Sequence, residues 1–154
     1  MKARRFALVP IVAGLALTTP SAYAAGPFAA YGGAWRGSGR FESNGRSEAL
    51  LCRSDNRPSR GGAAVALSLV CASDSFRLDI RSDLSTDGSG VHGTWTEASQ
   101  NVSGSVTGTI SRRQIDVSVM GSGFNANVAM RAIGKRLDFS LASQQGRVQI
   151  AMHR

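Results

Sequence analysis

The residues that could do chemistry in this chain are few and far apart. Its two histidines are His92 and His153, and Glu97 is the one carboxylate that shares an apolar strand face, two residues after Trp95. Nucleophilic catalysis needs a nucleophile with a positioned base, and acid–base catalysis needs paired carboxylates on one inner face. The serines instead fall in turns and on polar faces, as does His92. We therefore predict that the protein is not an enzyme and uses no cofactor.

Glu97 has two interpretations. As a residue at the end of a strand, it would point to solvent. As a carboxylate at the mouth of a closed fold, it would recognise a cationic group of a ligand or pair with an arginine.

The two cysteines, Cys52 and Cys71, predict one disulfide. They are equidistant from Gly61-Gly62, so a hairpin centred there would place them opposite each other on neighbouring strands, within bridging reach. On the loop-entropy argument the bridge would stabilise the fold by about 3 kcal/mol. Two cysteines and two distant histidines form no ligand cluster, so we predict no metal site.

The first 24 residues have the pattern of a cleaved secretory signal. Met1–Arg5 is basic, Phe6–Leu17 is apolar, and Ala22-Tyr23-Ala24 is a small-residue cleavage site. The apolar run is shorter than the roughly 20 residues needed to span a bilayer. We predict a signal peptide over 1–24, a single domain over 25–154, and a periplasmic or secreted location, where a disulfide persists.

The formal net charge is +8, and removal of Lys2, Arg4 and Arg5 with the leader leaves +5. The remaining arginines are scattered singly and alternate with acidic and small polar residues. No basic run is interleaved with aromatic residues, as a nucleic-acid surface would require. We predict no nucleic-acid partner.

The elements that would position these residues are strands, because apolar and polar residues alternate throughout the mature chain. Turn sequences such as Asn44-Gly45 and Asp55-Asn56-Arg57-Pro58 separate the alternating runs. Short connections favour neighbouring antiparallel strands. The expected strands cover 35–42, 47–53, 63–72, 76–81, 91–96, 102–110, 115–119, 124–130, 137–141 and 148–152.

Each of these strands has one apolar face, which a flat sheet would leave bare. These faces can be buried by closure into a barrel or by folding into two facing sheets. Closure also removes the edge strands, and we predict an all-β fold, an antiparallel meander of about 8–10 strands closed into a small barrel. Few aromatic residues and short strands argue against an outer-membrane barrel, so we predict no stable membrane insertion. Five inward glycines would either let the sheet bend or leave space for a ligand; they are Gly37, Gly39, Gly93, Gly104 and Gly108.

Gly33-Ala34-Trp35 leads into the first strand of the mature chain, and a second Gly-Thr-Trp occurs at 93–95. This pattern resembles the calycin group, which includes lipocalins and avidins. The resemblance implies a barrel whose first-strand tryptophan packs at the closed end under a basic side chain from near the chain's end. Arg147 is the first candidate for that side chain and Arg154 the second.

Three functions remain open. The barrel could hold a small apolar or amphipathic ligand against its inner aromatic side chains. It could bind an exported protein, for example as a protease inhibitor that uses a loop or the segment 25–28. It could also be a structural envelope protein without a ligand. A cavity of a few hundred cubic ångströms would favour the first function; the residues expected to line it are Trp35, Phe41, Trp95, Phe124 and Phe139.

Overall fold

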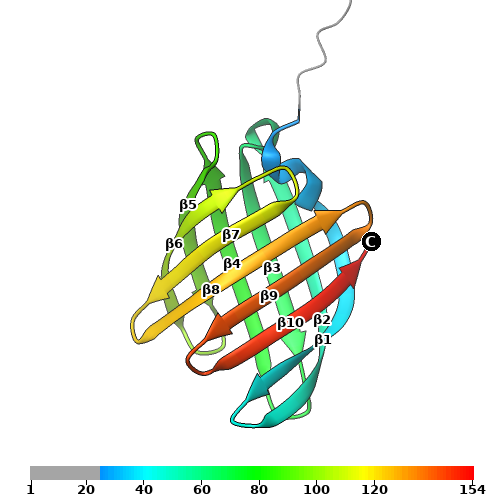
Figure 1. The fold of residues 1–154 in the computed structure, drawn as a ribbon, viewed down its shortest axis with the longest axis vertical. Helices are drawn as coiled ribbons and strands as arrows, with labels where there is room; N and C mark the ends of the chain where they lie inside the picture. Colours follow the sequence, from blue (N-terminus) through cyan, green and yellow to red (C-terminus); the bar gives the residue numbers. More distant parts are fainter. Residues whose placement is uncertain (1–24) are drawn as a thin grey trace, which may run out of the picture.

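The fold is seen in a computed structural model that describes residues 25–154 (Figure 1). The predicted signal peptide, 1–24, lies outside the described residues. Over the described range the chain forms ten strands and two short 3-10 helices. Neither of these helices is long and apolar enough to cross a membrane. In chain order the elements are η1 (Pro27–Tyr31), β1 (Gly33–Ser43), β2 (Arg46–Ser59), η2 (Arg60–Gly62), β3 (Ala64–Ala72), β4 (Arg77–Thr86), β5 (Gly90–Glu97), β6 (Val102–Ile110), β7 (Gln114–Gly121), β8 (Phe124–Ile133), β9 (Arg136–Ser143) and β10 (Gly146–His153).

Each strand pairs antiparallel with the next along the chain, and β10 pairs with β1 to close the barrel. The closing seam runs from Arg36 opposite His153 to Glu42 opposite Arg147. The predicted all-β antiparallel barrel is confirmed. Closure leaves no free strand edge in the sheet.

The β2–β3 hairpin confirms the predicted disulfide. Cys52 lies directly opposite Cys71, with their Cα atoms 4.1 Å apart, and the two sulfurs are bonded. At the next hairpin toward the N-terminus, Asn44 and Gly45 both have positive φ, 50° and 75°, as the two-residue turn requires.

The segment 55–58, which the sequence predicts to be a loop, is in fact strand. It continues β2, with Asn56 opposite Leu67 and Pro58 opposite Val65. Its residue types argue against a strand, but the alternation persists, because Asn56 points inward and is buried while Asp55 and Arg57 form an ion pair outside. The predicted loop was wrong because tertiary contacts outweighed local turn propensity.

The five inward glycines allow neighbouring strands to approach closely. A Cβ atom on any of them would lie 1.7–2.2 Å from a backbone carbonyl oxygen of the adjacent strand, closest at Gly104. None of the five lines the internal cavity. The five glycines therefore serve the close packing of neighbouring strands, and they do not provide the space of the cavity.

One end of the barrel is closed by η1, seen in blue at the top of Figure 1. Phe28, Tyr31 and Trp35 are fully buried there. The Trp35 indole N–H donates to the Tyr31 carbonyl at 3.0 Å. Burial, with the nearby negative charge of Asp116, raises the pKa of Tyr31, so its hydroxyl stays neutral.

The basic side chain over Trp35 is Arg154, whose guanidinium carbon lies 4.6 Å from the ring centroid. Arg154 also donates to the carbonyl oxygens of Gly32 and Gly134. The first candidate, Arg147, was wrong. It lies opposite Glu42, at the far end of β1 from Trp35, because β10 runs antiparallel to β1.

Candidate functional site

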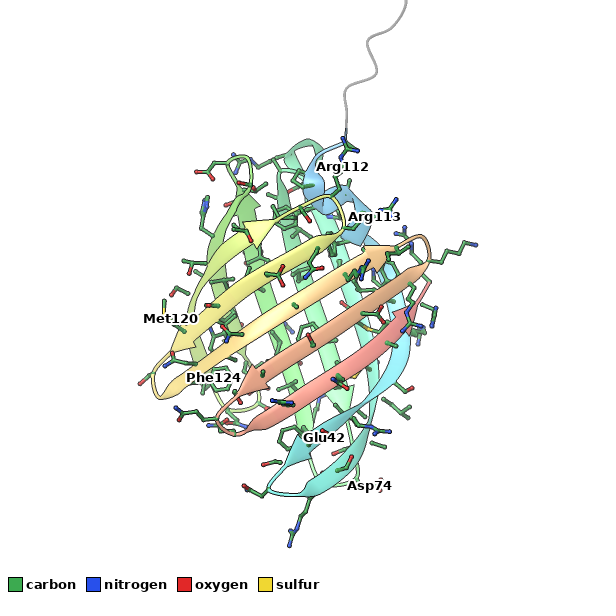
Figure 2. The ribbon with its side chains drawn as sticks, viewed as in Figure 1. Glu42, Asp74, Arg112, Arg113, Met120 and Phe124 are labelled. Carbon is green, nitrogen blue, oxygen red and sulfur yellow. A yellow bond between two sulfur atoms is a disulfide. The ribbon has the colours of Figure 1, made fainter. Side chains whose placement is uncertain are left out.

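The candidate site is a cavity of about 530 Å³ inside the barrel. Its wall is built mainly from inward aliphatic and aromatic side chains of nine strands. It reaches the barrel end opposite η1, which we call the mouth, because its lining includes Gln100, Ser122 and Gln145 from the loops at that end. Figure 2 shows the two ends: Arg112 and Arg113 lie near η1, and Glu42 and Asp74 lie beside the mouth. The volume is within the range of small-molecule sites.

Four of the five predicted lining residues face this cavity: Phe41, Trp95, Phe124 and Phe139. The fifth, Trp35, does not, because it is packed beneath η1 in the closed end. Trp35 thus belongs to the group that closes this end of the barrel, η1 with Phe28, Tyr31 and Trp35, which we call the plug.

Aromatic side chains from different strands meet near the mouth. Phe41 and Phe76 pack edge to face with their ring centroids 5.4 Å apart. Trp95 and Phe124 also lie 5.4 Å apart, and the Trp95 indole N–H donates to the Met120 carbonyl at 3.2 Å. These rings give the mouth an apolar part beside the polar loop residues Gln100, Ser122 and Gln145.

The β3–β4 loop that carries Phe76 is tied to β2 by a carboxylate. The backbone N–H of Ser75 donates to Glu48 at 3.0 Å, and the Ser75 hydroxyl donates to the same carboxylate at 2.6 Å. These bonds hold the Phe76 ring over the cavity.

Glu97 is buried and does not point to solvent, so the first interpretation of this residue was wrong. Its carboxylate accepts hydrogen bonds from the Ser99 hydroxyl and from the backbone N–H groups of Asp79 and Gln100, at 2.6–2.9 Å. Burial alone would raise the pKa of Glu97, but these hydrogen bonds outweigh it and hold the pKa below its usual value. Glu97 lines the cavity near the mouth while it anchors the β5–β6 loop.

At the opposite end of the cavity the wall contains two polar residues that the sequence did not single out. Ser54 and Asn56 are consecutive inward residues of β2, 7% and 2% exposed. The Ser54 hydroxyl donates to Asn56 Oδ1 at 2.6 Å, and Asn56 Nδ2 donates to the Tyr31 carbonyl at 3.0 Å. The persistent alternation through 54–58 was the signal that could have found them.

A serine–histidine pair lies outside the cavity. Ser85 Oγ is 3.0 Å from His92 Nε2 on the exposed face of β4 and β5. Within residues 25–154 no carboxylate is hydrogen-bonded to His92, and neither Ser85 nor His92 lines the internal cavity. The same residues contain no group of three or more histidine, cysteine or acidic side chains that could hold a metal ion.

A scan against protein-family models finds no match to this chain, and a search of curated proteins finds no match either. The assignment therefore stays at the level of the fold, a closed ten-stranded antiparallel barrel.

Proposed function

We propose that this protein is an exported, non-enzymatic binding protein that holds a small apolar or amphipathic molecule inside its barrel. The observation that carries the proposal is the internal cavity of about 530 Å³, closed at one end by η1 and lined mostly by apolar side chains. A barrel of purely structural use would be stabilised by a filled core, because every void forgoes packing contacts.

The segment 25–28, which the sequence suggested for protease inhibition, packs against the closed end of the barrel. Phe28 is fully buried in the plug, and the backbone N–H of Gly26 donates to the Gly61 carbonyl at 2.8 Å. A segment in this state is not free to lie in a protease cleft. This observation argues against protease inhibition through the segment 25–28.

The proposal is tested by native mass spectrometry of the protein recovered from its own cells and after incubation with a mixture of ten-carbon alcohols and ketones. We expect a bound small molecule. The Val128→Trp variant places a large ring in the cavity wall and should lose that molecule. The matched Leu51→Trp variant changes a side chain that is 75% exposed on the outer wall and should keep it. Protein that carries no added mass under either condition, or a Val128→Trp variant that binds as well as Leu51→Trp, would overturn the proposal.

A further inference from the structure

We propose that the ligand carries a neutral hydrogen-bonding group, a hydroxyl or a carbonyl, at the end that enters the cavity first. Asn56 and Ser54 bind this group at the end of the cavity opposite the mouth, which we call the floor. This inference rests on the proposed ligand-binding function and names the class of ligand.

The floor has unused hydrogen-bonding capacity. An asparagine amide offers two N–H donors and a carbonyl with two lone pairs, and a serine hydroxyl offers one donor and two lone pairs. Asn56 uses one donor, to the Tyr31 carbonyl, and one lone pair, for the Ser54 hydroxyl. One N–H of Asn56 and the lone pairs of Ser54 Oγ are left for a partner in the cavity. A ligand hydroxyl could both accept from Asn56 and donate to Ser54.

Holding the plug does not by itself require Asn56. The Tyr31 carbonyl, which accepts from Asn56, also accepts the indole N–H of Trp35 at 3.0 Å. It would stay hydrogen-bonded if Asn56 were apolar. A buried polar group with unmet hydrogen bonds costs roughly 1–3 kcal/mol, so an apolar side chain would suit an empty apolar floor better. The polar pair is favourable when a ligand or an ordered water completes its hydrogen bonds.

The bound group must be neutral because no charge at the floor compensates an ionised one. Among the described cavity-lining residues, the charged ones are Arg77 and Glu97, and both lie at the mouth end of their strands. Glu97 is occupied by the β5–β6 loop. The lining near Asn56 includes the apolar residues Leu67, Ile115 and Met152. Ser82, opposite Leu67, is polar but neutral, and its hydroxyl donates to the Thr94 carbonyl. An isolated carboxylate or ammonium there would face the full cost of desolvation.

The length of the cavity sets the size of the ligand. The inward lining residues of β4 extend from Leu78 near the mouth to Leu84 near the floor. Six steps of about 3.3 Å give about 20 Å along the strand, or about 15 Å along the axis of a barrel with the usual strand tilt. The geometry fits a chain of roughly ten carbons whose polar end reaches Asn56.

The test compares 1-decanol, 1-chlorodecane and decanoate at pH 8 by titration of tryptophan fluorescence, since Trp95 lines the cavity. The wild-type protein should bind 1-decanol about 5–10-fold more tightly than 1-chlorodecane, the ratio that one net hydrogen bond supplies, and decanoate most weakly. Asn56→Leu, and independently Ser54→Ala, should lower the alcohol preference toward 1 while binding 1-chlorodecane at least as well as before. Asn125→Leu, on the exposed outer face of β8, should leave the preference unchanged.

The possible outcomes separate the two proposals. If the wild-type protein binds none of the three probes, the proposed function fails, and this inference with it. If it binds 1-decanol and 1-chlorodecane equally, or if the Asn56 and Ser54 variants keep the alcohol preference, the inference is wrong and the ligand-binding function stands. Tightest binding of decanoate would overturn the neutral-group assignment.

Discussion

Replacing Arg154 with methionine tests how the closed end of the barrel is stabilised. The substitution keeps an unbranched side chain over Trp35 and removes the charge and the donors. The guanidinium lies 4.6 Å from the indole centroid and donates to the carbonyls of Gly32 and Gly134. A cation–π contact at an exposed site contributes about 0.5–1 kcal/mol, and a hydrogen bond from a charged donor contributes about 1.5 kcal/mol at the low end of its range. The bond to Gly134 is long, at 3.4 Å, so we count only the bond to Gly32 and expect a net loss of about 2 kcal/mol.

The measurement is thermal unfolding followed by circular dichroism, with urea unfolding to obtain the free energy. For a domain of this size a loss of about 2 kcal/mol lowers the Tm by about 8 °C. Arg147→Met is the matched control, because Arg147 lies on β10 at the opposite end of the barrel, away from Trp35. Arg154→Lys should be intermediate, since lysine keeps the charge and loses the planar fork. The reasoning is refuted if Arg147→Met is as destabilising as Arg154→Met, or if neither changes the Tm.

Three further predictions concern the sheet, the bridge and the mouth. Gly104→Ala would place a Cβ 1.7 Å from a carbonyl oxygen of β7, so urea unfolding should show a loss of roughly 1–3 kcal/mol or more; unchanged stability would show that the close approach is not needed. Reduction of the Cys52–Cys71 bridge should lower the free energy of unfolding by about 3 kcal/mol in urea titrations with and without reductant, and equal midpoints would contradict this. Because the folded-state pKa of Glu97 is depressed, its ionised form stabilises the fold above the ordinary glutamate pKa of about 4.3 and loses this effect as the pH falls through the folded value. The Glu97→Gln variant should therefore be less stable than wild type at pH 7, and the difference should shrink below pH 4 in urea titrations; a constant difference would refute the assignment.

The sequence was sufficient to predict the barrel because the alternation of apolar and polar residues leaves few ways to bury one face. It was also sufficient for the disulfide, since Cys52 and Cys71 are symmetric about a glycine turn. Four aromatic lining residues followed from the same alternation. All of these depend on which face of a strand a residue occupies, and that information is local.

What the sequence did not predict depends on the register between distant segments. Arg154 and Arg147 are both near the end of the chain, and only the pairing of β10 with β1 decides which one meets Trp35. Register also decides which residues lie beside each arginine on the adjacent strands, although the arginines are scattered singly along the sequence. On the outer wall Arg36 lies opposite both Arg53 and His153, which places three basic residues side by side on adjacent strands.

The missed residues at the cavity floor have a different physical origin. Asn56 lies in a stretch whose residue types favour a turn, and it was assigned to a loop for that reason. In the structure the same residue is 2% exposed in a strand interior, lines the cavity, and uses one of its two amide N–H groups, toward Tyr31. Tertiary contacts explain why this stretch is strand, but they do not explain why its buried inward residue is an asparagine and not an apolar one. A residue that breaks a local rule without an evident compensating gain is a candidate for a functional role. The five inward glycines also break a local preference, but a carbonyl oxygen of the neighbouring strand occupies the space that each side chain would need. Sheet geometry therefore explains the glycines. It does not explain Asn56, because the folded chain satisfies only part of the hydrogen-bonding capacity of its side chain.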